Sequence, residues 1–129
     1  MFINSHLATG YLLYKLNIFE KKWFPIWILS AWIPDIDGLW SSSVVEHHSV
    51  LHTQIFWIVL CSLGWIIGHL QKNINIKTFF IILFIGTFAH LFTDYITART
   101  VGIKWLYPLN DVDYFLYPII PENGDIPIW

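Results

Sequence analysis

Hydrophobic residues gather in four segments, each bounded by charged or turn-forming residues. In the first, residues 2–19, apolar side chains recur at steps of three and four positions, which predicts an amphipathic or interfacial helix. The second, residues 23–33, is almost wholly apolar and stops at Pro34, because a helix normally ends by the residue before a proline. The third and fourth, residues 55–70 and 78–92, each carry a single histidine and no Asp, Glu, Lys or Arg.

The two longer segments are candidate membrane spans. A hydrocarbon core of about 30 Å requires about 20 helical residues at 1.5 Å per residue, and both apolar runs are slightly shorter than that. Including the polar residues at their ends extends them to 53–71 and 77–95, which brings each close to the required length. We therefore predict two transmembrane helices here.

After Asp94, the remainder of the chain through Trp129 is rich in Pro, Asn, Asp, Tyr and Trp. This composition predicts an irregular interfacial cap with aromatic residues at the level of the lipid headgroups. No repeat, low-complexity tract or linker divides the sequence. We expect residues 1–129 to form a single all-α domain, a small integral membrane protein of about four helices with an irregular C-terminal cap.

Composition narrows the function classes further. Of 129 residues, 56% are hydrophobic and only 12% are charged, against roughly a quarter charged in an average soluble domain. A net charge of −2 provides no basic excess to pair with a phosphate backbone, so a nucleic-acid partner is not expected. The one cysteine, Cys61, cannot form an internal disulfide. Membrane lipid is the expected partner.

Consecutive helices that run antiparallel sort the polar residues onto two sides of the membrane. Five lysines fall on one side, against Arg99 and Lys104 on the other, where five of the six histidines also fall with three acidic residues. Because positive charge favours the cytoplasmic side, the histidine-rich side is expected to face away from the cytoplasm. The five lysines are Lys15, Lys21, Lys22, Lys72 and Lys77.

Several histidines and aspartates on that side have the spacing of metal ligands. His90 and Asp94 lie four residues apart on a predicted helix, so both side chains leave the same face one turn apart. His48 and His52 repeat this spacing, whereas His47 and His52 are five apart and would share a metal only at a turn or a helix start.

Two further candidates, Asp35 and Asp37, lie in the segment PDIDG, where a short irregular backbone could direct both carboxylates into a common cavity. Imidazole and carboxylate together suit zinc, with manganese or iron as alternatives, and no thiolate is available for a structural Cys-type zinc site. With His6, the candidate metal ligands are His6, Asp35, Asp37, His47, His52, His90 and Asp94.

These residues, in this order, resemble the LexA-regulated, inner-membrane metal-dependent hydrolases. That family's pattern has an N-terminal histidine, a PDxD motif after an apolar helix, an HR-x-x-THS-like stretch, an H-x-x-x-D helix end, and a Gly-containing stretch leading to a Trp-Pro-like element. This sequence departs from the pattern where His48 replaces an arginine and where Leu51 and Thr53 replace a threonine and a serine. The matching residues are His6, Pro34, Asp35, Asp37, the segment HHSVLHT, His90, Asp94, Gly102, Trp105, Tyr107 and Pro108.

The resemblance implies a bacterial inner-membrane hydrolase that uses one to three divalent metal ions. It favours His47 as a metal ligand. His48 is then a catalytic group that either contacts a metal ligand or faces the substrate. A metal ion lowers the pKa of a bound water and polarises an ester, and Asp37 is the candidate general base or orienting group. The order of ligands is also distantly similar to zinc-dependent phospholipase C, which suggests a phosphoester of a lipid or amphiphilic substrate.

Other interpretations of the same residues remain open. His90 and Asp94 could form a structural ion pair between helices, since ionisable groups at membrane depth must pair or function. The cluster could bind a divalent ion in transit, as in a transporter, or the chain could be a non-catalytic scaffold or accessory subunit. His69, on the opposite side, is expected to be structural. A homo-oligomer is compatible with the short apolar runs.

Overall fold

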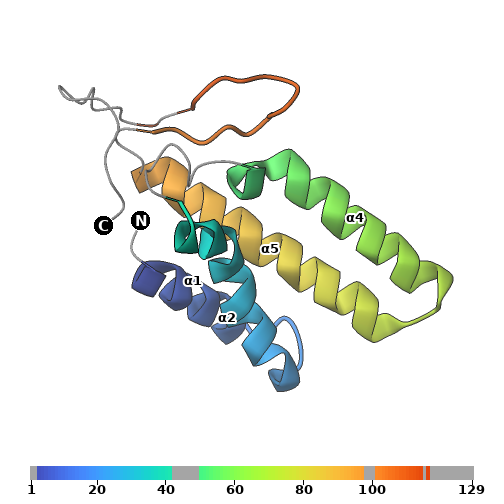
Figure 1. The fold of residues 1–129 in the computed structure, drawn as a ribbon. Helices are drawn as coiled ribbons and strands as arrows, with labels where there is room; N and C mark the ends of the chain where they lie inside the picture. The colour runs from blue at the N-terminus through green and yellow to red at the C-terminus, as the bar shows by residue number, and fades with distance from the viewer. Residues whose placement is uncertain (1–2, 42–49, 98–100, 115, 117–129) are drawn as a thin grey trace.

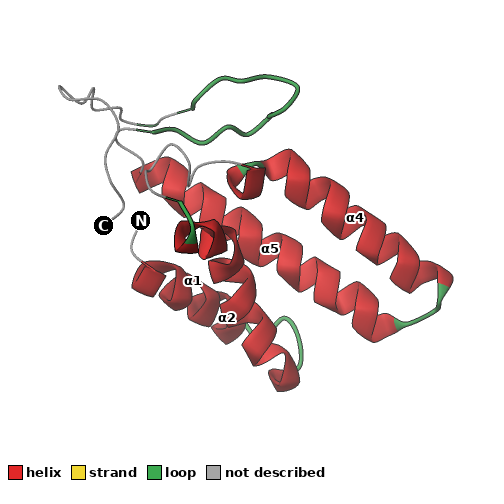
Figure 2. Ribbon diagram, viewed as in Figure 1, coloured by secondary structure: helices red, strands yellow, loops and turns green. Residues whose placement is uncertain are grey.

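Helices form nearly all the regular structure of this chain. The computed structural model describes residues 3–41, 50–97, 101–114 and 116 (Figure 1). Within these residues the chain has four α-helices, three short 3-10 helices and no β-strand (Figure 2), which confirms the predicted all-α class.

The first helix, α1, spans Ile3–Lys15. The prediction of a helix over residues 2–19 is wrong at its C-terminal end. Asn17, two residues beyond the helix, has a φ of 54°, the left-handed conformation in which helices commonly end and which asparagine tolerates. The helix therefore stops at Lys15, and the apolar residues that follow belong to the connection.

The second helix, α2, spans Phe24–Trp32, within one residue of the prediction at each end. The 3-10 helix η1, Lys21–Trp23, precedes it, and the 3-10 helix η2, Ile33–Leu39, follows it. Pro34 ends the α-helix as expected, but the prediction of an irregular backbone after it is wrong. Because Pro34 occupies the first turn of η2, where its missing N–H costs no hydrogen bond, the chain continues as a helical turn.

The two longest helices form an antiparallel hairpin (Figure 1). The 3-10 helix η3, Val50–His52, leads into α4, Gln54–Leu70, and α5 spans Ile74–Thr97. Asn73 caps the start of α5, because its Oδ1 accepts hydrogen bonds from the backbone N–H groups of Asn75 (3.0 Å) and Ile76 (3.2 Å). Of the described helices, only α5 is long and apolar enough to cross a membrane, with 24 residues and a mean hydropathy of 1.8.

The predicted second span, α4, is shorter. Its 17 residues correspond to about 26 Å of helix, slightly less than a hydrocarbon core. Its exposed surface is nevertheless mostly apolar from Ile58 to Leu70, and monomeric soluble proteins rarely expose a large apolar patch. The exposed apolar residues of α4 are Ile58, Val59, Leu60, Leu63, Trp65, Ile66, Ile67 and Leu70.

The α4–α5 hairpin packs against the N-terminal helices α1 and α2 mainly through α5. This helix contacts α2 on one side and α4 on the other. Close approach of α2 and α5 depends on Gly86, since a Cβ there would lie 1.8 Å from the Oγ of Ser30. Between α4 and α5 the core consists of Trp57, Cys61, Leu83 and Leu91. The crossing of α2 and α5 holds the helix ends that carry the candidate ligands.

After α5, residues 101–114 form an irregular segment, as predicted for the C-terminal cap. Ile103 and Tyr114 pair through two backbone hydrogen bonds of 3.1 Å, which close the segment on itself. The Lys104 ammonium donates a hydrogen bond to the Asp111 carboxylate, and this bond raises the pKa of Lys104 above its ordinary value.

Candidate metal centre

Six candidate ligands lie on elements that meet at one end of the helix bundle (Figure 1). The N-terminal part of α1 contributes one histidine, η2 two aspartates, η3 one histidine, and the C-terminal part of α5 a histidine and an aspartate. All six side chains are buried, and the three histidines are completely so. These residues are His6, Asp35, Asp37, His52, His90 and Asp94.

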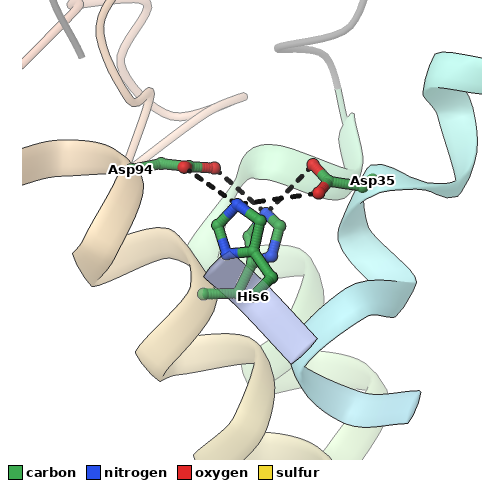
Figure 3. A group of neighbouring side chains, drawn as sticks. His6, Asp35 and Asp94 are labelled. Carbon is green, nitrogen blue, oxygen red and sulfur yellow. Dashed lines mark ion pairs between the residues drawn. The ribbon is translucent and has the colours of Figure 1, made fainter. Parts of the chain in front are cut away.

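Four of them could hold a metal ion together. One ligand atom from each of His6, Asp35, His90 and Asp94 lies within 4.8 Å of the others. Figure 3 shows the imidazole of His6 between the carboxylates of Asp94 and Asp35, which come from opposite sides of the site. Residues far apart in the sequence therefore share one small buried volume.

The histidines present the same ring atom to both carboxylates. The Nε2 of His6 lies 3.6 Å from Asp35 and 3.2 Å from Asp94. The Nε2 of His90 lies 3.4 Å from Asp35 and 3.1 Å from Asp94. His52, from η3, adds a third Nε2 at 3.5 Å from Asp35 and 3.7 Å from Asp94.

The opposite edges of the rings are held by other groups. His90 Nδ1 lies 2.8 Å from the backbone carbonyl of Ala31, the distance of a good hydrogen bond. If Nδ1 carries the proton that this carbonyl accepts, the Nε2 lone pair is left for a metal, the arrangement usual for metal-binding histidines. The hydroxyl of Thr93 lies 3.4 Å from His6 Nδ1 and also donates to the carbonyl of His90 at 2.7 Å.

Asp37 lies outside the group of four. Its Oδ2 is 3.6 Å from the Nδ1 of His52, while Asp35 lies on the Nε2 side of the same ring. The two aspartates of PDIDG thus contact opposite edges of one imidazole instead of entering one cavity together. This placement suits a residue that orients His52.

The spacing of the donor atoms fits a metal ion. The Nε2 atoms of His52 and His90 are only 3.3 Å apart, and two unprotonated nitrogens at this distance repel each other unless a proton or a cation lies between them. Donors bound to one ion at about 2.1 Å in tetrahedral geometry lie about 3.4 Å apart. Two buried carboxylates also require compensating positive charge, which a divalent ion supplies.

The three other histidines of the chain are not among these six residues. His47 and His48 lie outside the described residues. His69 is exposed near the C-terminal end of α4, where its ring stacks on Trp65 with a centroid distance of 5.4 Å, and it takes no part in the cluster.

The sequence interpretation missed two groups. The hydroxyl of Thr93 could have been found from its position three residues after His90 on the same helix. The carbonyl of Ala31 could not, because a backbone acceptor leaves no trace in the side-chain pattern.

Comparison with known proteins places most of the chain in a family. Residues 1–125 match a protein-family model described as "YdjM inner membrane protein". No curated protein and no solved structure matches this chain significantly.

Proposed function

Since the chain belongs to the YdjM inner membrane protein family, we propose that it is a membrane-embedded metal-dependent hydrolase that cleaves an ester of a lipid or amphiphilic substrate. One observation carries the proposal. Three buried imidazole Nε2 atoms each lie 3.1–3.7 Å from oxygens of both Asp35 and Asp94. A phosphoester is the first candidate for the bond cleaved.

The donor set supports hydrolysis. A divalent ion held there, zinc before manganese or iron, would polarise the ester and promote ionisation of water near neutral pH. Asp35 and Asp94 would neutralise the ion's charge, and His6, His52 and His90 would fix its position. These five donors suffice for one ion and allow a second to be shared through the carboxylates.

The remaining groups keep the donors in place. The Ala31 carbonyl sets the ring orientation of His90, and the Asp37 carboxylate orients His52 through Nδ1. We therefore assign Asp37 as a positioning residue in preference to a general base.

The distribution of lysines supports an orientation in the membrane. Lys15 ends α1, η1 contains Lys21 and Lys22, and Lys72 and Lys77 flank the start of α5. Between Lys77 and Asp94, α5 rises about 26 Å, so the lysines and the metal centre lie near opposite faces of a membrane. Under the positive-inside rule the lysine end is cytoplasmic and the site faces outward, at the level of the lipid headgroups.

Elemental analysis of the detergent-purified protein tests the proposal. We expect stoichiometric zinc, manganese or iron after gel filtration, and hydrolysis of phosphoester substrates such as bis(p-nitrophenyl) phosphate or phospholipid in mixed micelles. His90→Ala removes a donor and should abolish both, whereas His69→Ala, a histidine outside the cluster, should change neither. Circular dichroism of both variants checks that they remain folded.

The outcomes separate the competing functions. Full metal content and full hydrolysis in His90→Ala would refute the assigned site. Metal uptake into reconstituted vesicles without ester cleavage would instead favour a transporter. A folded protein that binds no metal when divalent ions are supplied would favour a scaffold.

A further inference from the structure

The ring of His6, which α1 contributes to the candidate metal centre, must present the correct edge to the carboxylates. It stacks on the ring of His90, with the two centroids 3.8 Å apart and the planes inclined by 26°. Stacking fixes the plane of the ring but not its edge, because a ring turned over by half a turn stacks in the same way. In the turned ring a carbon would replace Nε2, so a polar group at the opposite edge is needed to select the orientation.

Thr93 lies at that opposite edge. It is on α5, three residues after His90 and one before Asp94, and its Oγ1 lies 3.4 Å from the Nδ1 of His6. The same oxygen lies 2.7 Å from the backbone carbonyl of His90. One hydroxyl of α5 therefore contacts a candidate ligand of α1 and the backbone of a second candidate ligand.

The hydrogen-bonding capacity of these groups determines where the protons lie. A hydroxyl has a single proton to donate, and the carbonyl of His90, which can only accept, is closer and receives it. The Thr93 oxygen then offers His6 a lone pair, which requires a proton on Nδ1. A neutral imidazole has one ring proton, so Nε2 keeps its lone pair and faces the Asp94 carboxylate at 3.2 Å (Figure 3). In this tautomer Nε2 can bind a cation.

The other two histidines of the cluster are held in the same sense by different groups. The carbonyl of Ala31 lies 2.8 Å from the Nδ1 of His90, and the carboxylate of Asp37 lies 3.6 Å from the Nδ1 of His52. A histidine that binds a metal through one nitrogen usually donates the proton of the other to such an acceptor. Thr93 supplies the corresponding acceptor for the third ring.

We propose that Thr93 is a positioning residue that selects the Nδ1-protonated tautomer of His6 and so directs its Nε2 to the metal ion. The inference rests on the proposed metal centre and deepens it. The ligand from α1 is then oriented by a side chain of α5, the helix that carries His90 and Asp94.

Nitrogen NMR tests the tautomer directly. The full-length protein, isotopically labelled in its histidines and loaded with zinc in detergent micelles, is compared before and after removal of the metal, with signals assigned by correlation to the backbone. The one-bond coupling to hydrogen identifies the protonated nitrogen of each ring. We expect zinc-loaded His6 to carry its proton on Nδ1 and zinc on Nε2. A proton on Nε2 would overturn the inference.

Three matched variants measure what the hydroxyl contributes. Thr93→Val removes the hydroxyl but keeps the branched side chain, and it should lower zinc affinity about 10- to 100-fold in competition with a chromophoric chelator. Thr93→Ser retains a hydroxyl and should recover most of that affinity. Thr87→Val is the control, because Thr87 is a buried threonine of the same helix whose hydroxyl donates to the carbonyl of Leu83 at 2.9 Å. It should bind zinc like the wild type.

Failure of the inference is distinguishable from failure of the hydrolase proposal. If Thr93 only packs α1 against α5, Thr93→Val would lower thermal stability but leave zinc affinity unchanged, or its defect would persist in Thr93→Ser. Either result would overturn the inference even if the protein hydrolyses esters. The expected tautomer together with rescue by serine would support it even if no ester is cleaved, and only the hydrolase proposal would then fail. A wild-type protein that binds no divalent ion would overturn both.

Discussion

We expect the crossing of α2 and α5 to control the geometry of the candidate metal centre, and Gly86→Ala tests this expectation. Gly86 lies one turn before His90 on α5, and Ser30 precedes Ala31 on α2. A Cβ at position 86 would lie 1.8 Å from the Oγ of Ser30, 2.5 Å from its Cβ and 3.0 Å from its carbonyl carbon. Since carbon and oxygen normally approach to about 3.3 Å, the two helices would have to separate by roughly 1 Å.

The size of the effect follows from these distances. Overpacking typically costs about 1–3 kcal/mol, and the better helix propensity of alanine returns about 1 kcal/mol. A separation of 1 Å would also lengthen the 2.8 Å contact between His90 Nδ1 and the Ala31 carbonyl beyond hydrogen-bonding distance. Loss of such an outer partner lowers metal affinity about 10- to 100-fold, so we expect a weaker metal site as well as a less stable protein.

The assay measures zinc affinity by competition with a chromophoric chelator, and stability by thermal unfolding in detergent. Gly64→Ala is the matched control, since a Cβ there would meet the ring of Phe80 at the α4–α5 contact and would meet no residue of the candidate metal centre. It should retain wild-type affinity. Adding Ser30→Gly to Gly86→Ala removes the two closest contacts and should restore most of the affinity.

Wild-type affinity in Gly86→Ala would refute this reasoning. So would a Gly86→Ala defect that Ser30→Gly leaves unchanged, because the clash with Ser30 would then not be its cause.

Two further substitutions test separate parts of the structure. Asp37→Asn removes the charge 3.6 Å from His52 Nδ1 and should weaken metal binding about 10- to 100-fold without abolishing it; binding as tight as wild type would show that Asp37 does not orient His52. Asn73→Ala removes the acceptor for the N–H groups of Asn75 and Ile76 and should lower stability by about 1 kcal/mol with no change in metal content. Loss of metal in that variant would contradict the expectation that the turn between α4 and α5 has no effect on metal binding.

The sequence by itself determined the helices and most of their limits, because these depend on neighbours along the chain. Apolar periodicity indicated the first helix and continuous apolar runs indicated the other three, and Pro34 marked the end of the second, since a helix normally ends by the residue before a proline. The i, i+4 spacing of His90 and Asp94 predicted that they share a face, and their side chains are in contact. The end of α1 was missed because the left-handed conformation of Asn17, which the sequence only permits, stops the helix.

Only the tertiary structure decided how the ligands combine. His6 and Asp94 lie far apart in the sequence, and their separation of 3.2 Å results from the packing of α1, α2 and α5, which no local pattern specifies. The same packing separated the positions of Asp35 and Asp37, two residues apart in one motif, by placing them on opposite edges of His52. Local sequence thus supplied the donors, and long-range packing selected which donor atoms meet.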